Sequence, residues 1–182
     1  KNEEKVLGRC LDSVEKIADE IIIVDTGSTD RTKEIAAKYG AKIFNMEWQE
    51  DFSLARNLSF LKAEMDYCMW LDADDIIRES EMLKLLRWKV ETDGSADVLM
   101  VRYVAAFDEK RNPTLVYYRE RLIKNNSGFR WQGRVHEAIQ ARGKVEYLDC
   151  EIEHHSIKTE YSRRNLSIYE MMEKKGEPFS DR

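Results

Sequence analysis

Short β-branched runs alternate with helical patterns along the first half of this chain, and that alternation restricts the fold more than any other feature. Ile21–Val24 holds four apolar residues in a row, too few for a helix and apolar on both faces of a strand. A strand of this kind belongs inside a parallel sheet that is covered on both sides. We therefore expect an α/β fold.

Further elements are predicted on either side of this strand. Apolar residues recur at three- and four-residue spacing between Glu3 and Ala18, which is the pattern of an amphipathic helix. The other expected elements are a helix over residues 28–39, a strand over Ala41–Asn45, a helix over Phe52–Ala63 with Ser53 as its N-cap, a strand over Tyr67–Leu71 and a helix over Glu79–Val90. Together they predict a doubly wound, mostly parallel sheet with helices on both faces.

The second half of the chain has a different pattern. Val98–Ala106 and Thr114–Ile123 are predicted to form a smaller antiparallel portion, joined by a hairpin turn. A short strand is expected before His154, and a last helix from about Ser162 to Lys174. The break near Ala96 is interpreted as a change of layer, so that residues 1–182 form a single domain.

Composition excludes several classes of function. The net charge of −5 gives no basic face for nucleic acid, and no apolar run approaches the ~18 residues of a membrane span. Cys10 and Cys68 fall in apolar patterns, and the cysteines are odd in number, so we predict buried free thiols and a cytoplasmic location. The chain begins at Lys1 without an initiator methionine, and we expect it to be a piece of a longer protein.

Three carboxylates follow the strand expected at Tyr67–Leu71, namely Asp72, Asp74 and Asp75. Ligands of open α/β sheets bind at the carboxyl ends of strands, and clustered carboxylates repel one another unless a cation holds them. Mg²⁺ typically takes one or two carboxylates together with phosphate oxygens, so this predicts a metal–phosphate site. The alternatives are a solvated acidic turn that caps the next helix and a calcium loop.

A turn at Asp25–Asp30 joins a predicted strand to a helix whose N-terminus offers free N–H groups to an anion. Gly27 permits close backbone approach, and Asp25 stands where it can accept hydrogen bonds from a base or ribose. Arg56, on the third expected helix, is a candidate for phosphate contacts. The alternatives are an ordinary capped turn and a surface arginine.

Histidines supply the remaining candidates. His136-Glu137 lacks the second histidine of H-E-x-x-H, so the zinc motif is excluded. His136 remains a candidate metal ligand, with a structural hydrogen bond as the alternative, and Glu137 a candidate general base. One of His154 and His155 is a candidate for a metal or diphosphate contact, with solvent exposure as the alternative.

Four motifs occur in the order and spacing of a known family. They are Asn2-Glu3-Glu4, Val24–Asp30, Ala55-Arg56-Asn57 and Leu71–Asp75, and together they resemble the family 2 glycosyltransferases of the GT-A fold. Gly133–Glu137 is similar to an element of a bacterial branch that includes lipopolysaccharide core and tetratricopeptide-linked transferases. Members begin with a strand before Asn-Glu-Glu, so the sheet is expected to lack a central strand unless the protein extends upstream.

The resemblance implies a nucleotide-diphosphate sugar donor, with a UDP-sugar as first candidate, and Mg²⁺ or Mn²⁺ as cofactor. Residues 1–95 would bind the donor, residues 96–160 would hold the acceptor and catalytic groups, and residues 161–182 would form a C-terminal helix. The implied donor-binding residues are Glu3, Asp25, Thr26, Arg56 and Asp72. Asp74 and His136 are the implied metal ligands.

The family reaction is a single displacement with inversion. The metal neutralises charge on the leaving diphosphate, and a carboxylate removes the proton from the attacking acceptor hydroxyl. Glu137 is the first candidate for this base and Asp75 the second. The acceptor would be a glycan, a lipid-linked group or a protein, at the inner face of the membrane in the peripheral case. Two alternatives are a metal-dependent nucleotidyltransferase and a non-catalytic nucleotide-sugar-binding domain.

Overall fold

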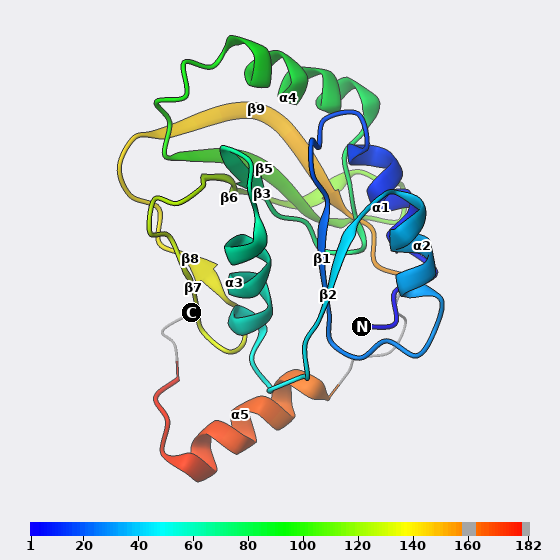
Figure 1. Ribbon diagram of the computed structural model, residues 1–182, viewed down its shortest axis with the longest axis vertical. Coiled ribbons are helices and arrows are strands. Elements are labelled where there is room, and N and C mark those ends of the chain that lie inside the picture. The colour runs from blue at the N-terminus through cyan, green and yellow to red at the C-terminus, as the bar shows by residue number, and fades with distance from the viewer. Residues whose placement is uncertain (158–162, 180–182) are drawn as a thin grey trace.

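The computed structural model describes residues 1–157 and 163–179 (Figure 1). The first half of the chain contains α1 (Leu7–Val14), β1 (Ile22–Asp25), α2 (Thr32–Lys38), β2 (Lys42–Asn45), α3 (Phe52–Lys62), β3 (Tyr67–Met69), β4 (Asp75–Ile76) and α4 (Glu79–Glu91). The second half contains β5 (Val98–Phe107), β6 (Pro113–Lys124), β7 (Trp131–Gln132), β8 (Ala138–Ile139), β9 (Val145–His154) and α5 (Arg164–Lys175).

The strands form one larger sheet and two pairs. The five-stranded sheet has the order β3-β6-β5-β9-β4, in which β5 and β9 are parallel and the other neighbours antiparallel. Strands β1 and β2 form a parallel pair, and β7 and β8 an antiparallel one. The α/β class is confirmed. The antiparallel pairing includes β3 as well as the predicted hairpin of β5 and β6.

Helices cover both faces of the larger sheet (Figure 1). On one face α1 and α4 bury Val14 and Leu85 against Val101 of β5 and Ile152 of β9. On the other face Phe60 of α3 packs with a cluster around Trp70, Val98, Ile123, Trp131 and Ile139. The apolar positions predicted for the first helix are all buried. Cys10 and Cys68 are buried free thiols, as the sequence predicted, and Cys150 is buried and free as well.

Several elements differ from the sequence prediction. Helix α1 spans Leu7–Val14 rather than Glu3–Ala18, and β3 ends at Met69 rather than at Leu71. The N-cap of α3 is Asp51, whose side chain accepts a hydrogen bond from the Leu54 N–H, while the Ser53 hydroxyl donates to Asp51. The strand before His154 is ten residues long rather than short. The expected start of the last helix at Ser162 lies outside the described residues, and α5 begins at Arg164.

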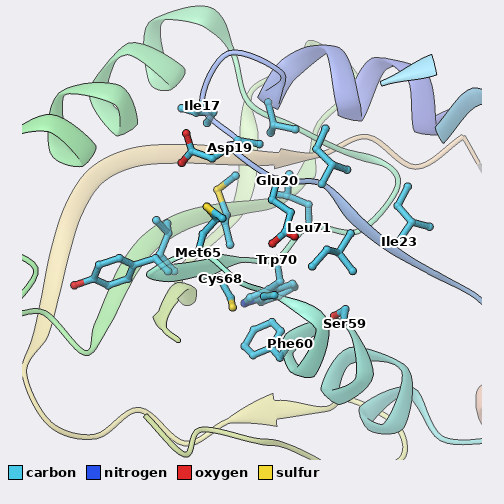
Figure 2. A pocket seen from close by; sticks show the side chains of 18 of the residues that line it. Ile17, Asp19, Glu20, Ile23, Ser59, Phe60, Met65, Cys68, Trp70 and Leu71 are labelled. Atoms are coloured by element: carbon cyan, nitrogen blue, oxygen red, sulfur yellow. The ribbon is translucent and has the colours of Figure 1, made fainter. Parts of the chain in front are cut away.

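A cavity of about 1030 Å³ lies between β1 and β3. Among the described residues β1 pairs only with β2, and β3 only with β6, so the sheet is interrupted here as the family resemblance led us to expect. Figure 2 shows the side chains that line this space, among them Ile23 of β1, Cys68 of β3 and Phe60 of α3. In the part of the chain that the structure describes, no helix combines the length and apolar character needed to cross a membrane.

Candidate active site

The acidic loop after β3 is shaped by its own hydrogen bonds and by the end of β9. The Asp75 N–H donates to the Asp72 carbonyl, and the Asp72 N–H donates to the Asp75 carboxylate, each at 3.0 Å. Asp75 then begins β4, which pairs with β9 so that Asp75 stands opposite His154. The His155 N–H also donates to the Asp74 carbonyl at 2.8 Å. The end of β9 therefore brings an imidazole to the acids.

Asp74, Asp75 and His154 form a group that can hold a metal ion, with their ligand atoms all within 4.8 Å of one another. His154 Nδ1 lies 3.3 Å from Asp75 Oδ1 and 3.6 Å from Asp74 Oδ1. The hydrogen bond to the Asp75 carboxylate raises the pKa of His154 despite its partial burial, and the charge of Asp74 adds to this effect. Carboxylates suit Mg²⁺ and Mn²⁺, and imidazole is a common ligand of divalent metals, so the residues present fit a divalent cation.

His136 does not belong to this group in the part of the chain that the structure describes. It is exposed and has a φ of 55°, a left-handed conformation in a tight loop. His155, the other histidine considered from the sequence, lies 2.7 Å from Glu153 and contacts the ring of Phe107. The geometry therefore favours His154 as the histidine that accompanies the acids.

Asp75 is tied into the core rather than presented to a ligand. Its side chain and that of Arg121 are both 0% exposed, and they form an ion pair at 2.9 Å. Asp75 Oδ1 also accepts a hydrogen bond from the Tyr103 hydroxyl at 3.1 Å. The Arg121 guanidinium lies over Trp70, 3.8 Å from the ring centroid. This burial argues against Asp75 as the second candidate for the base, because an acceptor hydroxyl cannot reach a carboxylate that is enclosed and already paired.

Arg56 of α3 joins two acids that are far apart in the sequence. Its Nη2 donates to Asp72 at 2.7 Å and its Nε to Glu137 at 2.5 Å. Its guanidinium carbon lies 4.7 Å from the Trp70 ring centroid and 4.8 Å from that of Trp131. Burial raises the pKa of Asp72, but the charges of Arg56 and Arg121 outweigh it, so that the pKa is lowered overall. Arg56 is thus not a surface arginine, and Asp72 is ionised at neutral pH.

The loop that carries Glu137 is held by α3. The Trp131 N–H donates to the Asn57 side chain at 2.9 Å, and the Asn57 amide donates to the Trp131 carbonyl at 3.0 Å. Gly133 has a φ of 95°, which a residue with a side chain rarely adopts. This turn directs Glu137 back toward Arg56, whereas the adjacent His136 is exposed.

The N-terminal segment is bound to the turn after β1. The Asn2 N–H donates to the Ser28 hydroxyl and the Glu3 N–H to the Thr32 hydroxyl, at 2.9 and 2.8 Å. Asp25 is buried and accepts hydrogen bonds from the N–H groups of residues 27 and 28. Burial raises the pKa of Asp25, but the hydrogen bond with the Ser28 hydroxyl and those from the two N–H groups outweigh it, so that the pKa is lowered overall.

The cavity between β1 and β3 connects several of the predicted donor-binding residues. Its lining includes Glu3, Asp25, Arg56 and Asp72. Thr26 lies beside Asp25 and is half-buried, outside that lining. Sequence reasoning missed Arg121 and Tyr103, which hold Asp75 from strands β6 and β5. Only their position in apolar strand patterns, a weak signal, marks them as buried.

Comparison with known proteins decides the family. The model of glycosyl transferase family 2 matches residues 1–144. The chain belongs to this family. A TPR repeat-containing protein of Synechococcus elongatus is 35% identical over 140 residues, which are 76% of this chain and 33% of that protein. The lipopolysaccharide core biosynthesis glycosyltransferase LpsC of Rhizobium meliloti is 30% identical over 166 residues, covering 79% of this chain and 56% of LpsC.

Solved structures share the fold of this family 2 domain. S. aureus TarS superposes with a TM-score of 0.63 at 17% identity, covering 85% of this chain and 35% of TarS. Glucosyl-3-phosphoglycerate synthase from Mycobacterium tuberculosis gives a TM-score of 0.56 at 15% identity, covering 98% of this chain and 78% of the synthase. The chain thus has the GT-A fold of these glycosyltransferases. The chain spans about a third of the length of the TPR repeat-containing protein and just over half of the length of LpsC.

Proposed function

We propose that this domain transfers a sugar from a nucleotide-diphosphate sugar to an acceptor hydroxyl, with inversion and with the help of a divalent cation. The observation that carries the proposal is the placement of a possible metal group, Asp74 with His154, beside the Arg56-linked acids Asp72 and Glu137. Family membership supports a sugar-transfer reaction at this place. Solved relatives of the same fold are described with UDP-GlcNAc, and with Mn²⁺ and UDP, which supports a UDP-sugar as donor.

Asp74 and His154 are the proposed ligands of Mg²⁺ or Mn²⁺, with Asp75 behind them. When bound, the ion neutralises charge on the leaving diphosphate. The geometry favours His154 over His136 in this role, because only His154 lies within reach of Asp74 among the described residues. Asp75 supports the site from within the core, where Arg121 balances its charge.

The donor would lie with its nucleoside near Glu3, Asp25 and Thr26, and with its ribose or sugar near Asp72. Glu137 is the proposed base, which takes the proton of the acceptor hydroxyl as the oxygen attacks the anomeric carbon. The hydroxyl belongs to a glycan, a lipid-linked group or a protein. Glu137 is partly buried with an exposed fraction of 10% for its side chain, so a bound acceptor would complete its separation from water.

Release of UDP from UDP-sugars tests the reaction class. We expect the domain to release UDP from at least one UDP-sugar in the presence of Mn²⁺, with water as a slow acceptor. A nucleotidyltransferase would instead release pyrophosphate from a nucleoside triphosphate. A non-catalytic binding domain would bind the donor without turnover. Either of these results would replace the proposal.

The cation site is tested by Asp74→Asn. We expect this change to abolish the Mn²⁺-dependent part of UDP binding in calorimetry, because one of the two proposed ligands loses its charge. Asp149→Asn is the control, since that side chain is 83% exposed and far along β9 from the acids. Equal Mn²⁺-dependent affinity in the Asp74→Asn variant and the wild-type protein would refute the metal assignment.

A further inference from the structure

We propose that Arg56 is a positioning residue, which fixes Glu137 relative to Asp72 so that the base for the acceptor hydroxyl is held beside the donor sugar. The inference rests on the proposed function, and it departs from the phosphate contact that the sequence predicted for Arg56. The guanidinium has a separate donor for each acid, Nε for Glu137 and Nη2 for Asp72. A planar guanidinium therefore sets both the distance and the angle between the two carboxylates.

The guanidinium is itself immobilised. Trp70, which directly follows β3, and Trp131 of β7 both lie against it, with ring centroids less than 5 Å from its central carbon. The two rings stand at 87° to each other, so they contact the guanidinium from different directions. Only 20% of the Arg56 side chain is exposed. Contacts between cations and aromatic faces strengthen when water is excluded, so this arrangement holds the fork in one orientation.

Arg56 also separates two like charges. Asp72 and Glu137 share one cation, so their carboxylates are brought close together across it. Without that cation the two carboxylates would repel each other, which would favour a shift of Glu137 away from Asp72, although the Arg134 carbonyl still accepts a hydrogen bond from the Phe52 N–H. The neighbouring arginines do not duplicate this role among the described residues, since Arg121 pairs with Asp75 and Arg119 with Glu120.

The next residue on α3 supports the same interpretation. Asn57 forms two hydrogen bonds with the backbone of Trp131, at the start of the segment that ends in Glu137. One turn of α3 therefore holds this segment at both ends, by Asn57 at Trp131 and by Arg56 at Glu137. The helix acts as the reference against which the base is placed.

A double-mutant cycle on UDP release tests the coupling. For Arg56→Gln we expect kcat to fall about 100-fold, the scale of a misplaced catalytic group, with a smaller change in the affinity for UDP-sugar. Arg56→Lys should recover only part of kcat, because an ammonium cannot fork between two carboxylates. The double variant Arg56→Gln/Glu137→Gln should be no slower than Glu137→Gln alone, within about twofold. Arg31→Gln, at an exposed ion pair, is the control.

Two results of this cycle would overturn the inference. In the first, the fold losses in kcat of the two single variants multiply in the double variant, which means that Arg56 acts independently of Glu137. In the second, Arg56→Gln weakens calorimetric UDP-sugar affinity as much as it lowers kcat/KM while kcat is unchanged, which means that Arg56 is a donor-binding residue.

Hydrogen exchange provides a test that needs no turnover. In the Arg56→Gln variant we expect faster exchange in residues 133–139 and unchanged exchange in α4, and the Arg31→Gln variant should match the wild-type protein. Unchanged exchange in residues 133–139 would overturn the inference even if the domain releases no UDP. If the wild-type protein releases no UDP but the Arg56→Gln variant shows the predicted faster exchange, the proposed function alone is refuted.

Discussion

At the residue scale, the buried pair of Asp75 and Arg121 decides what the acidic loop can do. Both side chains are fully buried, and two nitrogens of Arg121, Nε and Nη2, have no hydrogen-bond partner in the described part of the chain. In place of hydrogen-bond partners, the guanidinium contacts the faces of Trp70 and Tyr103, which attract a cation. The acid next to the proposed metal ligand is therefore a structural anchor, which leaves Asp74 as the proposed acidic ligand of the cation.

The anchor role predicts a large loss of stability in Asp75→Asn. Removing one partner of a buried ion pair leaves an uncompensated charge, and such changes cost about 3–5 kcal/mol. We expect urea denaturation of Asp75→Asn to show a loss of this size. Asp149→Asn, which removes a carboxylate of the same kind from the surface, should stay within about 0.5 kcal/mol of the wild-type protein. An equally small loss in Asp75→Asn would contradict the anchor role.

At the element scale, the sequence predicted those elements whose pattern is local. The helices α1, α3 and α4 have regular apolar spacing, and the hairpin of β5 and β6 has a polar turn at its centre. The length of β9 was missed because its sequence carries four acids, a residue type that strands disfavour. Its parallel pairing with β5 overrides that preference by burying Cys150 and Ile152.

In the candidate site, too, only the residues marked by a local sequence pattern were predicted. Asp72 and Asp74 were recognisable because they directly follow an apolar strand, and the proposed base Glu137 because it stands beside a histidine. The partners that hold them come from distant segments, such as Arg56, 81 residues before Glu137, and Arg121, 46 residues after Asp75. Spacing in the sequence cannot reveal which of several arginines meets which acid, because the pairing is set by the packing of α3 and β6.

The loop that carries Glu137 depends on Gly133, and this predicts a functional effect of Gly133→Ala. A Cβ at this position would lie 3.4 Å from the Val135 carbonyl oxygen, and the φ of 95° is unfavourable for alanine. We expect the loop to shift, with UDP release falling by about 10-fold or more as the base moves from its place.

Gly176→Ala is the matched control for this change. Gly176 also has a positive φ, 67°, but a Cβ there would meet no atom within 4 Å. It caps α5, so its substitution should lower stability by about 1 kcal/mol and leave the rate of UDP release unchanged. If both variants lose stability and neither loses activity, Gly133 is required only for folding.

At the scale of the whole molecule, the cavity between β1 and β3 is the main departure from a continuous sheet. Its lining is largely apolar, with Leu11, Ile23 and Met69 among the residues that face it. Lys1 also lines it and lies beside the turn that follows β1, since Asn2 is bonded to Ser28. A strand joined to Lys1 would therefore end at the carboxyl end of β1 and run parallel to it, between the edges of β1 and β3 that have no strand partner among the described residues.

This geometry predicts that an apolar strand fused to Lys1 stabilises the domain. An eight-residue extension rich in valine and isoleucine should raise Tm relative to a Gly-Ser extension of equal length, because it buries apolar surface and pairs two exposed edges. A gain of about 2 kcal/mol corresponds to about 4–8 °C for a chain of this size. Amides of Ile22–Val24 and Tyr67–Met69 should at the same time become protected from hydrogen exchange. Equal Tm and equal exchange for both extensions would show that the cavity does not accept a strand.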